Sequence, residues 1–233
     1  MEYVIRVLRH NKNTSTSYWQ EFLFEGSKDT SVATVLRELN ARTPLLDRLG
    51  KEAKTISWEC GCMVRKCGAC AMKINGLPRL ACSTFLRELK GKKIELEPLS
   101  KFPKVEDLVV DRSAVFEKLK ETQIWLEQDA VMSKYTKEKR YQSARCLMCG
   151  CCLEICPNFS VEGTFAGAIL PVNGYRIFEE EQESKHEQEV EERYQTQFFE
   201  GCGKSLSCQN ICPAKIPVEE LMVRSNAAAI WKK

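Results

Sequence analysis

The sequence predicts an α+β fold in its first hundred residues and a mostly helical second half. Before Pro98, runs of alternating apolar and polar residues are separated by short polar or glycine-containing turns. After Pro103, segments with apolar residues at helical spacing predominate. The length of 233 residues suits one large domain or two small ones. We therefore expect two domains, over residues 1–104 and 105–233.

The first half is predicted to open with two strands and a helix. Tyr3–Arg9 and Tyr18–Phe24 have the alternation of strands, and a polar turn separates them. A helix is expected to begin at Ser31, because the apolar residues that follow recur at helical spacing. Asp29 or Ser31 would cap its N-terminus, since both side chains can accept a hydrogen bond from a free backbone N–H.

Four further strands are expected in the first half. Thr55–Trp58 is predicted to be a strand that leads into a glycine- and cysteine-rich loop. Ala71–Ile74 and Leu80–Ala81 flank the pair Asn75–Gly76, which is typical of a tight β-hairpin turn. Lys93–Glu97 is predicted to be the last strand of this half.

The second half is predicted to consist of helices joined by cysteine-containing loops. Helical spacing of apolar residues occurs over Val115–Met132, Tyr194–Phe199 and Val218–Trp231. Phe178–Arg193 contains eight acidic residues, and we interpret it as a solvated helix.

Composition excludes several classes of protein. The net charge of +3 does not indicate nucleic-acid binding. The chain begins with a strand pattern instead of a signal peptide, and its longest apolar stretch, near Ala166–Val172, is too short to span a bilayer. We therefore expect a soluble protein in a reducing cytosol. There the 13 cysteines are more often metal ligands than disulfides, while 2 histidines leave little for a histidine-based site.

The first group of cysteines has the spacing of a plant-type [2Fe–2S] site. Cys62, Cys67 and Cys70 follow the pattern C-x4-C-x2-C, and Cys82 comes after eleven further residues. A loop can surround one side of a small cluster with three thiolates while a later segment supplies the fourth. A structural zinc site is the alternative, but such sites usually use two C-x2-C pairs, and this group has one.

The second group, Cys146-x2-Cys149-x2-Cys152-x3-Cys156-Pro157, is the run typical of bacterial ferredoxins. In such a run the first three thiolates bind one cluster, and the fourth usually binds a neighbouring one. This rule requires a second run elsewhere in the chain.

The third group, Cys202-x5-Cys208-x3-Cys212-Pro213, supplies that second run, with Ser205 at the position of the missing ligand. If the last cysteines cross between the runs, the predicted [4Fe–4S] ligands are Cys146, Cys149, Cys152 and Cys212. The other cluster then has the ligands Cys156, Cys202 and Cys208. Three thiolates predict a [3Fe–4S] cluster. A Ser205 oxygen is an alternative fourth ligand, although it suits this soft site less well than sulfur.

The remaining residues contain no catalytic set. Cys60 and Cys151 are left over and are interpreted as thiols that bind no iron. No G-x-G-x-x-G motif follows a predicted strand, and His10 and His186 lie in contexts that form no nucleophile–base pair. Three clusters without such a set indicate a chain that transfers electrons.

In order and spacing, the three cysteine groups resemble those of the iron–sulfur subunit of succinate dehydrogenase/fumarate reductase. The resemblance covers nearly the whole chain and includes Leu80-Ala81-Cys82. It implies a plant-ferredoxin-like (β-grasp) domain with [2Fe–2S] over residues 1–104. It also implies an all-α helical ferredoxin domain with [4Fe–4S] and [3Fe–4S] over residues 105–233.

The resemblance further implies a role and partners. The chain would relay electrons between an FAD-containing catalytic subunit, facing the [2Fe–2S] end, and a membrane anchor with a quinone site and sometimes haem, facing the [3Fe–4S] end. It would have no catalytic residue of its own and no membrane span. It would lie on the cytoplasmic face of the bacterial inner membrane.

Two positions depart from the family pattern. Pro157–Val161 lacks the tryptophan that many members carry there, and Gly203 stands where many succinate dehydrogenases have histidine. Quinone contacts are therefore not carried over. Two other hypotheses remain: the same electron-transfer chain serving another flavoprotein reductase or a soluble partner, and a zinc-binding interaction module without redox chemistry.

Overall fold

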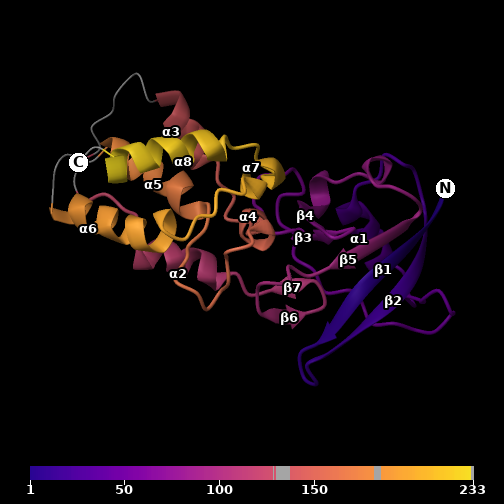
Figure 1. The fold of residues 1–233 in the computed structure, drawn as a ribbon. Coiled ribbons are helices and arrows are strands. Elements are labelled where there is room, and N and C mark those ends of the chain that lie inside the picture. The colour runs from indigo at the N-terminus through magenta and orange to yellow at the C-terminus, as the bar shows by residue number, and fades with distance from the viewer. Residues whose placement is uncertain (128, 130–136, 181–184, 232–233) are drawn as a thin grey trace. The chain divides into compact units, whose positions relative to one another are not determined.

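The computed structural model describes residues 1–127, 129, 137–180 and 185–231. Contacts divide the chain into two compact units, Met1–Asp111 and Arg112–Lys233 (Figure 1). The first unit contains a sheet and the second is helical, so the predicted α+β and all-α halves are confirmed. The assignment of functional domains to residues 1–104 and 105–233 stays a prediction.

The first unit is built on a five-stranded mixed sheet with the strand order β2-β1-β5-β3-β4. β1 pairs with β2 in antiparallel and with β5 in parallel orientation, and β3 is antiparallel to both of its neighbours. In chain order the strands are β1 (Glu2–Asn11), β2 (Thr16–Glu25), β3 (Ala71–Ile74), β4 (Leu77–Leu80) and β5 (Lys93–Glu97). Since side chains alternate along a strand, Arg9 lies on the same buried face of β1 as Ile5 and Val7.

The predicted helix and hairpin of this unit are both present. Helix α1 (Val32–Asn40) begins after Ser31, whose Oγ accepts a hydrogen bond of 3.1 Å from the N–H of Thr34. Asn75 and Gly76 join β3 and β4 with φ values of +50° and +77°. Such left-handed values are those of the type I′ turn that the Asn-Gly pair predicts. Two short 3₁₀ turns, η1 (Ala81–Ser83) and η2 (Leu86–Glu88), follow β4.

The predicted strand over Thr55–Trp58 is wrong. This segment is extended, but among the described strands none pairs with it. Its backbone groups are bonded mainly to side chains, which the pattern of apolar residues could not indicate. A small ladder of β6 (Lys104–Glu106) and β7 (Val109–Val110) was not predicted, because such short strands have no alternation to detect.

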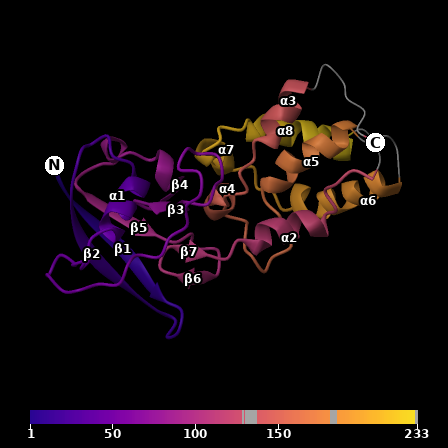
Figure 2. The same ribbon diagram turned by 180° about the vertical axis from the view of Figure 1, so that it is seen from behind.

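Helix α5 (Ile169–Glu180) lies at the centre of the second unit (Figures 1 and 2). Its contacts are with α2 (Ser113–Glu121), α3 (Lys137–Ala144), α6 (Lys185–Tyr194) and α8 (Val218–Asn226). Two short helices, α4 (Cys151–Ile155) and α7 (Ser207–Ile211), pack against each other. Wide π turns, η3 (Gln195–Phe199) and η4 (Ala227–Trp231), extend α6 and α8. The predicted helical character of Tyr194–Phe199 and Val218–Trp231 is thus confirmed.

The helix predicted over Val115–Met132 is shorter than expected. Helix α2 ends at Glu121, where the hydroxyl of Thr122 donates to the Lys118 carbonyl oxygen at 2.6 Å, and Gln123 has a φ of +57°. Met132 lies outside the described residues, as do residues 181–184 of the predicted acidic helix. Among the helices that the structure describes, none has the length and apolar character needed to cross a bilayer.

Candidate iron–sulfur cluster sites

Every cysteine of the chain is a free thiol, and eleven of them gather in three places. Within the described residues, no three His, Cys, Asp or Glu side chains converge in a way that suits a single metal ion. In a multi-iron cluster the thiolates bind different iron atoms, so they lie farther apart than the ligands of one ion.

Backbone N–H groups surround the sulfur atoms of the first loop. The Sγ of Cys62 accepts hydrogen bonds from the N–H groups of Val64 (3.4 Å) and Lys66 (3.1 Å), and the Sγ of Cys67 accepts one from Cys62 (3.4 Å). A Cβ at Gly61 would lie 3.3 Å from the Cys67 sulfur, so this position favours glycine. The loop therefore supplies donors that stabilise negative charge on sulfur.

The two sides of this first site differ in their environment. The N–H groups of Val64 and Lys66 lower the pKa of Cys62 to about 7. Burial raises the pKa of Cys70 to about 12, and the thiols of Cys82 and Cys67 nearby contribute to the rise. Cys82 also donates its N–H to the Cys70 sulfur at 3.4 Å. The four predicted ligands thus lie together, with an exposed edge at Cys67 and a buried edge at Cys70.

The second site combines residues that are far apart in the sequence. Burial raises the pKa of Cys152, and the thiols of Cys149 and Cys212 close by raise it further. Burial also raises the pKa of Cys146, again with Cys149 and Cys212 as electrostatic neighbours. Cys212, at the end of α7, therefore lies with the first three cysteines of the second run.

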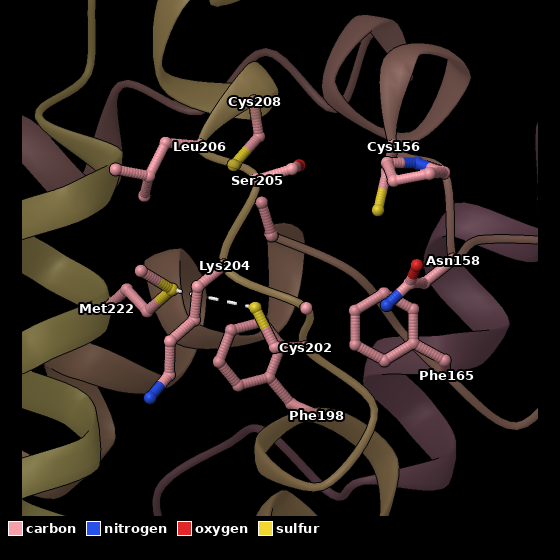
Figure 3. Close-up of a pocket in the computed structure, with 13 residues that line it drawn as sticks. Cys156, Asn158, Phe165, Phe198, Cys202, Lys204, Ser205, Leu206, Cys208 and Met222 are labelled. Carbon is pink, nitrogen blue, oxygen red and sulfur yellow. Dashed lines mark hydrogen bonds between the residues drawn. The ribbon is translucent and has the colours of Figure 1, made fainter.

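The third site is a cavity of about 120 Å³ that Cys156, Cys202 and Cys208 line together with Ser205. Figure 3 shows the three sulfur atoms pointing into the same space. Burial raises the pKa of Cys208, and the nearby thiols of Cys156 and Cys202 add to this. The rest of the wall is mainly apolar and includes Phe165, Phe198, Leu206 and Met222. This arrangement is the one that crossed ligation requires.

The two remaining cysteines lie beside these sites. Cys60 is exposed in the loop before Cys62. Cys151 is fully buried in α4, and its thiol donates a hydrogen bond that lowers the pKa of Cys149. Sequence spacing identified both as left over, but it did not indicate this contact.

Sequence reasoning also missed two residues at the second site. The Asn173 amide on α5 lies 3.9 Å from the sulfur of Met148, which in turn lies 3.7 Å from the Cys146 sulfur. Asn173 is 7% exposed and also donates to the Ile169 carbonyl oxygen at 2.8 Å. Nothing in the pattern around Asn173 distinguishes it from other polar helix residues.

The chemistry of the three sites fits iron–sulfur clusters. Their candidate ligands are all sulfur, which is the donor that such clusters use. Except for the exposed Cys67, the candidate ligands are partly or fully withdrawn from solvent, and backbone N–H groups point at sulfur atoms of the first site. Structural zinc sites have no need of a cavity between their thiolates.

Two family models match the chain. A 2Fe-2S iron-sulfur cluster binding domain matches residues 4–117, and a 4Fe-4S dicluster domain matches residues 142–216. A solved structure, the Mycobacterium smegmatis Sdh1 complex in the apo form, has a chain with a TM-score of 0.79 at 21% identity. That match covers 99% of this chain and 97% of the other, and it shows a shared fold.

Curated relatives match over most of their length. The succinate dehydrogenase iron-sulfur subunit of Bacillus subtilis (strain 168) is 32% identical over 224 residues, covering 91% of this chain and 86% of the relative. The fumarate reductase iron-sulfur subunit of Escherichia coli O157:H7 is 28% identical over 229 residues, with the same coverage of 91% and 86%. That of Wolinella succinogenes is 25% identical over 232 residues and covers 92% of both chains.

The three cysteine sites of this fold and the matches to known proteins support the same conclusion. The chain belongs to the family of succinate dehydrogenase/fumarate reductase iron–sulfur subunits, and it is an electron-transfer subunit that carries iron–sulfur clusters.

Proposed function

We propose that eleven cysteines hold three clusters in this chain. The [2Fe–2S] ligands are Cys62, Cys67, Cys70 and Cys82. The [4Fe–4S] ligands are Cys146, Cys149, Cys152 and Cys212. The [3Fe–4S] ligands are Cys156, Cys202 and Cys208. The [2Fe–2S] cluster belongs to the domain of residues 1–104, and the other two belong to residues 105–233.

The observation that carries this proposal is the exchange of cysteines between the second and third runs. Cys156 lines the cavity of Cys202 and Cys208, although it follows Cys152 by only four residues. Cys212 instead neighbours Cys149. The third cavity contains Ser205 where a fourth thiolate would stand, which supports a three-iron cluster there.

When bound, such clusters supply one-electron oxidation and reduction. The residues of the chain ligate the iron and adjust the surroundings of each site. The N–H groups of Val64 and Lys66 stabilise the charge on the Cys62 sulfur. Around the third site, Phe165 and Phe198 exclude water, so charge there is screened less than in solvent.

We further propose that the chain connects an FAD-containing catalytic subunit with a membrane anchor that has a quinone site. The whole complex would act as a succinate:quinone oxidoreductase or a quinol:fumarate reductase. This chain would be held at the cytoplasmic face of the bacterial inner membrane by that anchor. The relatives, which include subunits of both succinate dehydrogenase and fumarate reductase, support this proposal.

Single cysteine-to-serine variants test the ligand assignment. Cys212→Ser is expected to reduce the [4Fe–4S] signal in low-temperature electron paramagnetic resonance and to leave the [3Fe–4S] signal. Cys156→Ser is expected to do the reverse. Cys151→Ser, a neighbouring change at a thiol without an assigned iron, is the control and should retain both signals. If the effects of Cys212→Ser and Cys156→Ser are exchanged, the ligands do not cross and the assignment is wrong.

Purification from membranes tests the partners. The tagged chain is expected to copurify with a flavoprotein and a hydrophobic membrane protein, and the complex should reduce a quinone with succinate or oxidise a quinol with fumarate. Isolation with a different flavoprotein reductase, or with soluble partners only, would instead favour the same electron-transfer chain in another enzyme. Bound zinc without acid-labile sulfide would contradict both.

A further inference from the structure

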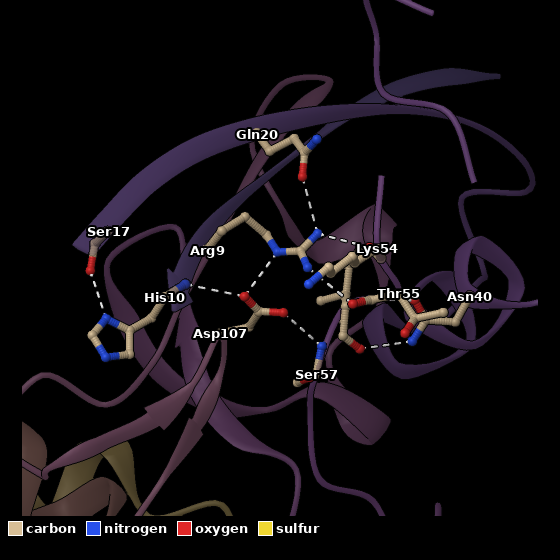
Figure 4. Close-up of polar contacts among 10 residues, drawn as sticks. Arg9, His10, Ser17, Gln20, Asn40, Lys54, Thr55, Ser57 and Asp107 are labelled. Atoms are coloured by element: carbon tan, nitrogen blue, oxygen red, sulfur yellow. Dashed lines mark hydrogen bonds and ion pairs between the residues drawn. The ribbon is translucent and has the colours of Figure 1, made fainter. Parts of the chain in front are cut away.

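The extended segment Lys54–Ser57 is held by three side chains from elsewhere in the first unit (Figure 4). The terminal nitrogens of Arg9 donate to the carbonyl oxygens of Lys54 (3.1 Å) and Thr55 (3.0 Å). Asp107 accepts a hydrogen bond of 2.9 Å from the N–H of Ser57. We call Arg9, Asn40 and Asp107 the polar clamp.

Asn40 completes the clamp by acting as a strand would. Its amide nitrogen donates to the Ile56 carbonyl oxygen, and its amide oxygen accepts from the Ile56 N–H, both at 2.8 Å. A neighbouring strand offers one donor and one acceptor to a residue in the same way. Leu108, next to Asp107, also donates its N–H to the Ser57 carbonyl oxygen at 3.1 Å.

Two members of the clamp, Arg9 and Asp107, are buried and paired with each other. The Nε of Arg9 lies 2.9 Å from Oδ1 of Asp107, and their side chains are only 6% and 5% exposed. Gln20 accepts from Arg9 at 3.0 Å, and Asp107 also accepts the N–H of His10 at 3.1 Å. Moving Arg9 and Asp107 apart would leave two buried charges without partners, which is costly. The two side chains therefore hold the segment in one position.

The clamped segment leads directly into the first cysteine loop. Four residues separate Ser57 from Cys62, and the loop ends at Cys70, immediately before β3. Between these two ends, Val64 is 67% exposed, and the residues at 65–67 are exposed as well. An exposed loop has few packing contacts, so its conformation depends strongly on how its ends are held.

We propose that Arg9, Asn40 and Asp107 are positioning residues for the [2Fe–2S] cluster, because they fix the N-terminal end of the loop that carries its ligands. This inference rests on the proposed function through the assignment of Cys62 and Cys67. A displaced loop end lengthens the hydrogen bonds from Val64 and Lys66 to sulfur. Since such hydrogen bonds favour the reduced cluster, loosening the clamp lowers its potential.

Two mild substitutions and one matched control test the proposal in the full chain. Asn40→Asp keeps the acceptor for the Ile56 N–H and removes the donor to its carbonyl oxygen. Asp107→Asn keeps the shape of the side chain and removes its charge. Glu95→Gln is the control. It weakens the ion pair of 2.7 Å between Glu95 and Arg6, a residue of β1 like Arg9, and it does not touch the clamped segment. Each variant is titrated electrochemically and its reduced [2Fe–2S] spectrum recorded, with the thermal midpoint measured on the same sample.

We expect both clamp variants to lower the [2Fe–2S] midpoint potential and broaden its spectrum. The [3Fe–4S] signal of the same sample should be unchanged, and the control should behave as the wild type. A lower thermal midpoint with an unchanged [2Fe–2S] potential and spectrum would show that the clamp only stabilises the fold, and the proposal would be overturned. Absence of a [2Fe–2S] signal in the wild type would instead contradict the proposed function. If Asp107→Asn does not fold, the result for Asn40→Asp alone tests the proposal.

Discussion

Ser205 stands in the wall of the third cavity, at the position where the second run has a cysteine. We predict that Ser205→Cys adds a fourth thiolate and converts the cluster towards [4Fe–4S], with a lower potential because the ligand charge increases. The loss of the oxidised [3Fe–4S] signal in electron paramagnetic resonance measures the conversion. Ser207→Cys, outside the cavity wall, should keep the three-iron signal. An unchanged signal in Ser205→Cys would show that the third run is aligned wrongly.

Asn173 is expected to influence the second site. When Cys146 is a thiolate it has no proton to donate to Met148. The Asn173 amide, which lies beside both sulfur atoms, is then the donor, and its hydrogen bond counters part of the rise that burial causes in the pKa of Cys146. We predict that Asn173→Leu lowers the [4Fe–4S] midpoint potential in a redox titration. Asn226→Leu, which removes a buried amide that accepts from Tyr194 at 2.7 Å, is the control and should leave this potential unchanged. Equal effects of the two variants would contradict the prediction.

The sequence predicted the candidate ligands of the second and third sites better than the residues around them. The spacing of Cys146, Cys149 and Cys152 and the gap at Ser205 identified the ligand candidates, because cluster ligands follow fixed local patterns. Asn173 reaches Met148, which lies inside the second run, through the tertiary packing of α5. No local pattern records such a contact, so it became visible only in the structure.

At the scale of elements, Gly167 lies just before α5 and packs closely against α4. Its φ is +69°, and an added Cβ would lie 2.5 Å from a methyl group of Leu153 in α4. We predict that Gly167→Ala lowers the free energy of unfolding by about 2–4 kcal/mol, combining backbone strain with overpacking. Gly50→Ala, with a φ of +77° and no neighbour within 4 Å, isolates the strain and should cost about 1–2 kcal/mol. Chemical denaturation measures both, and equal losses would contradict the packing contribution.

Helices α3 and α8 are joined by Glu220, which pairs with Lys139 and, at 3.1 Å, with Arg224. Lys139, and then Arg224, hold the pKa of Glu220 below its ordinary value of 4.5. A lowered pKa contributes stability that is present above 4.5 and is lost as the pH falls through the pKa of the folded state. We therefore predict that Glu220→Gln lowers the thermal midpoint at pH 7 but has a smaller effect near pH 4. A difference that is constant with pH would argue against the ion pairs.

The elements also show where sequence patterns reach their limit. β1, β2, α1 and the β3–β4 hairpin follow from alternation, a cap and a turn pair, all of which are local signals. Thr55–Trp58 has the same apolar alternation, yet side chains replace its neighbouring strand. Local pattern predicts that a segment is extended, whereas its hydrogen-bond partners include residues far along the chain, such as Arg9 and Asp107.

At the scale of the whole molecule, each unit has its own buried core. In the first unit Ile5, Phe22, Leu36 and Ile94 are almost completely buried, and in the second unit Tyr175 and Tyr194 are. We predict that residues 1–111 fold alone and bind about two iron atoms with two sulfides. Iron and sulfide analysis with the [2Fe–2S] spectrum checks this. An unfolded or iron-free fragment would show that the first unit depends on the rest of the chain.

The exchange of cysteines between α4 and α7 has a consequence for biosynthesis. The first site has all of its ligands once Cys82 has left the ribosome. Cys156 must wait for Cys202 and Cys208, and Cys146 for Cys212, so neither of the other sites has a full ligand set until Cys208 and Cys212 have emerged. With the proposed ligands, the first site can therefore be completed well before the other two as the chain is made.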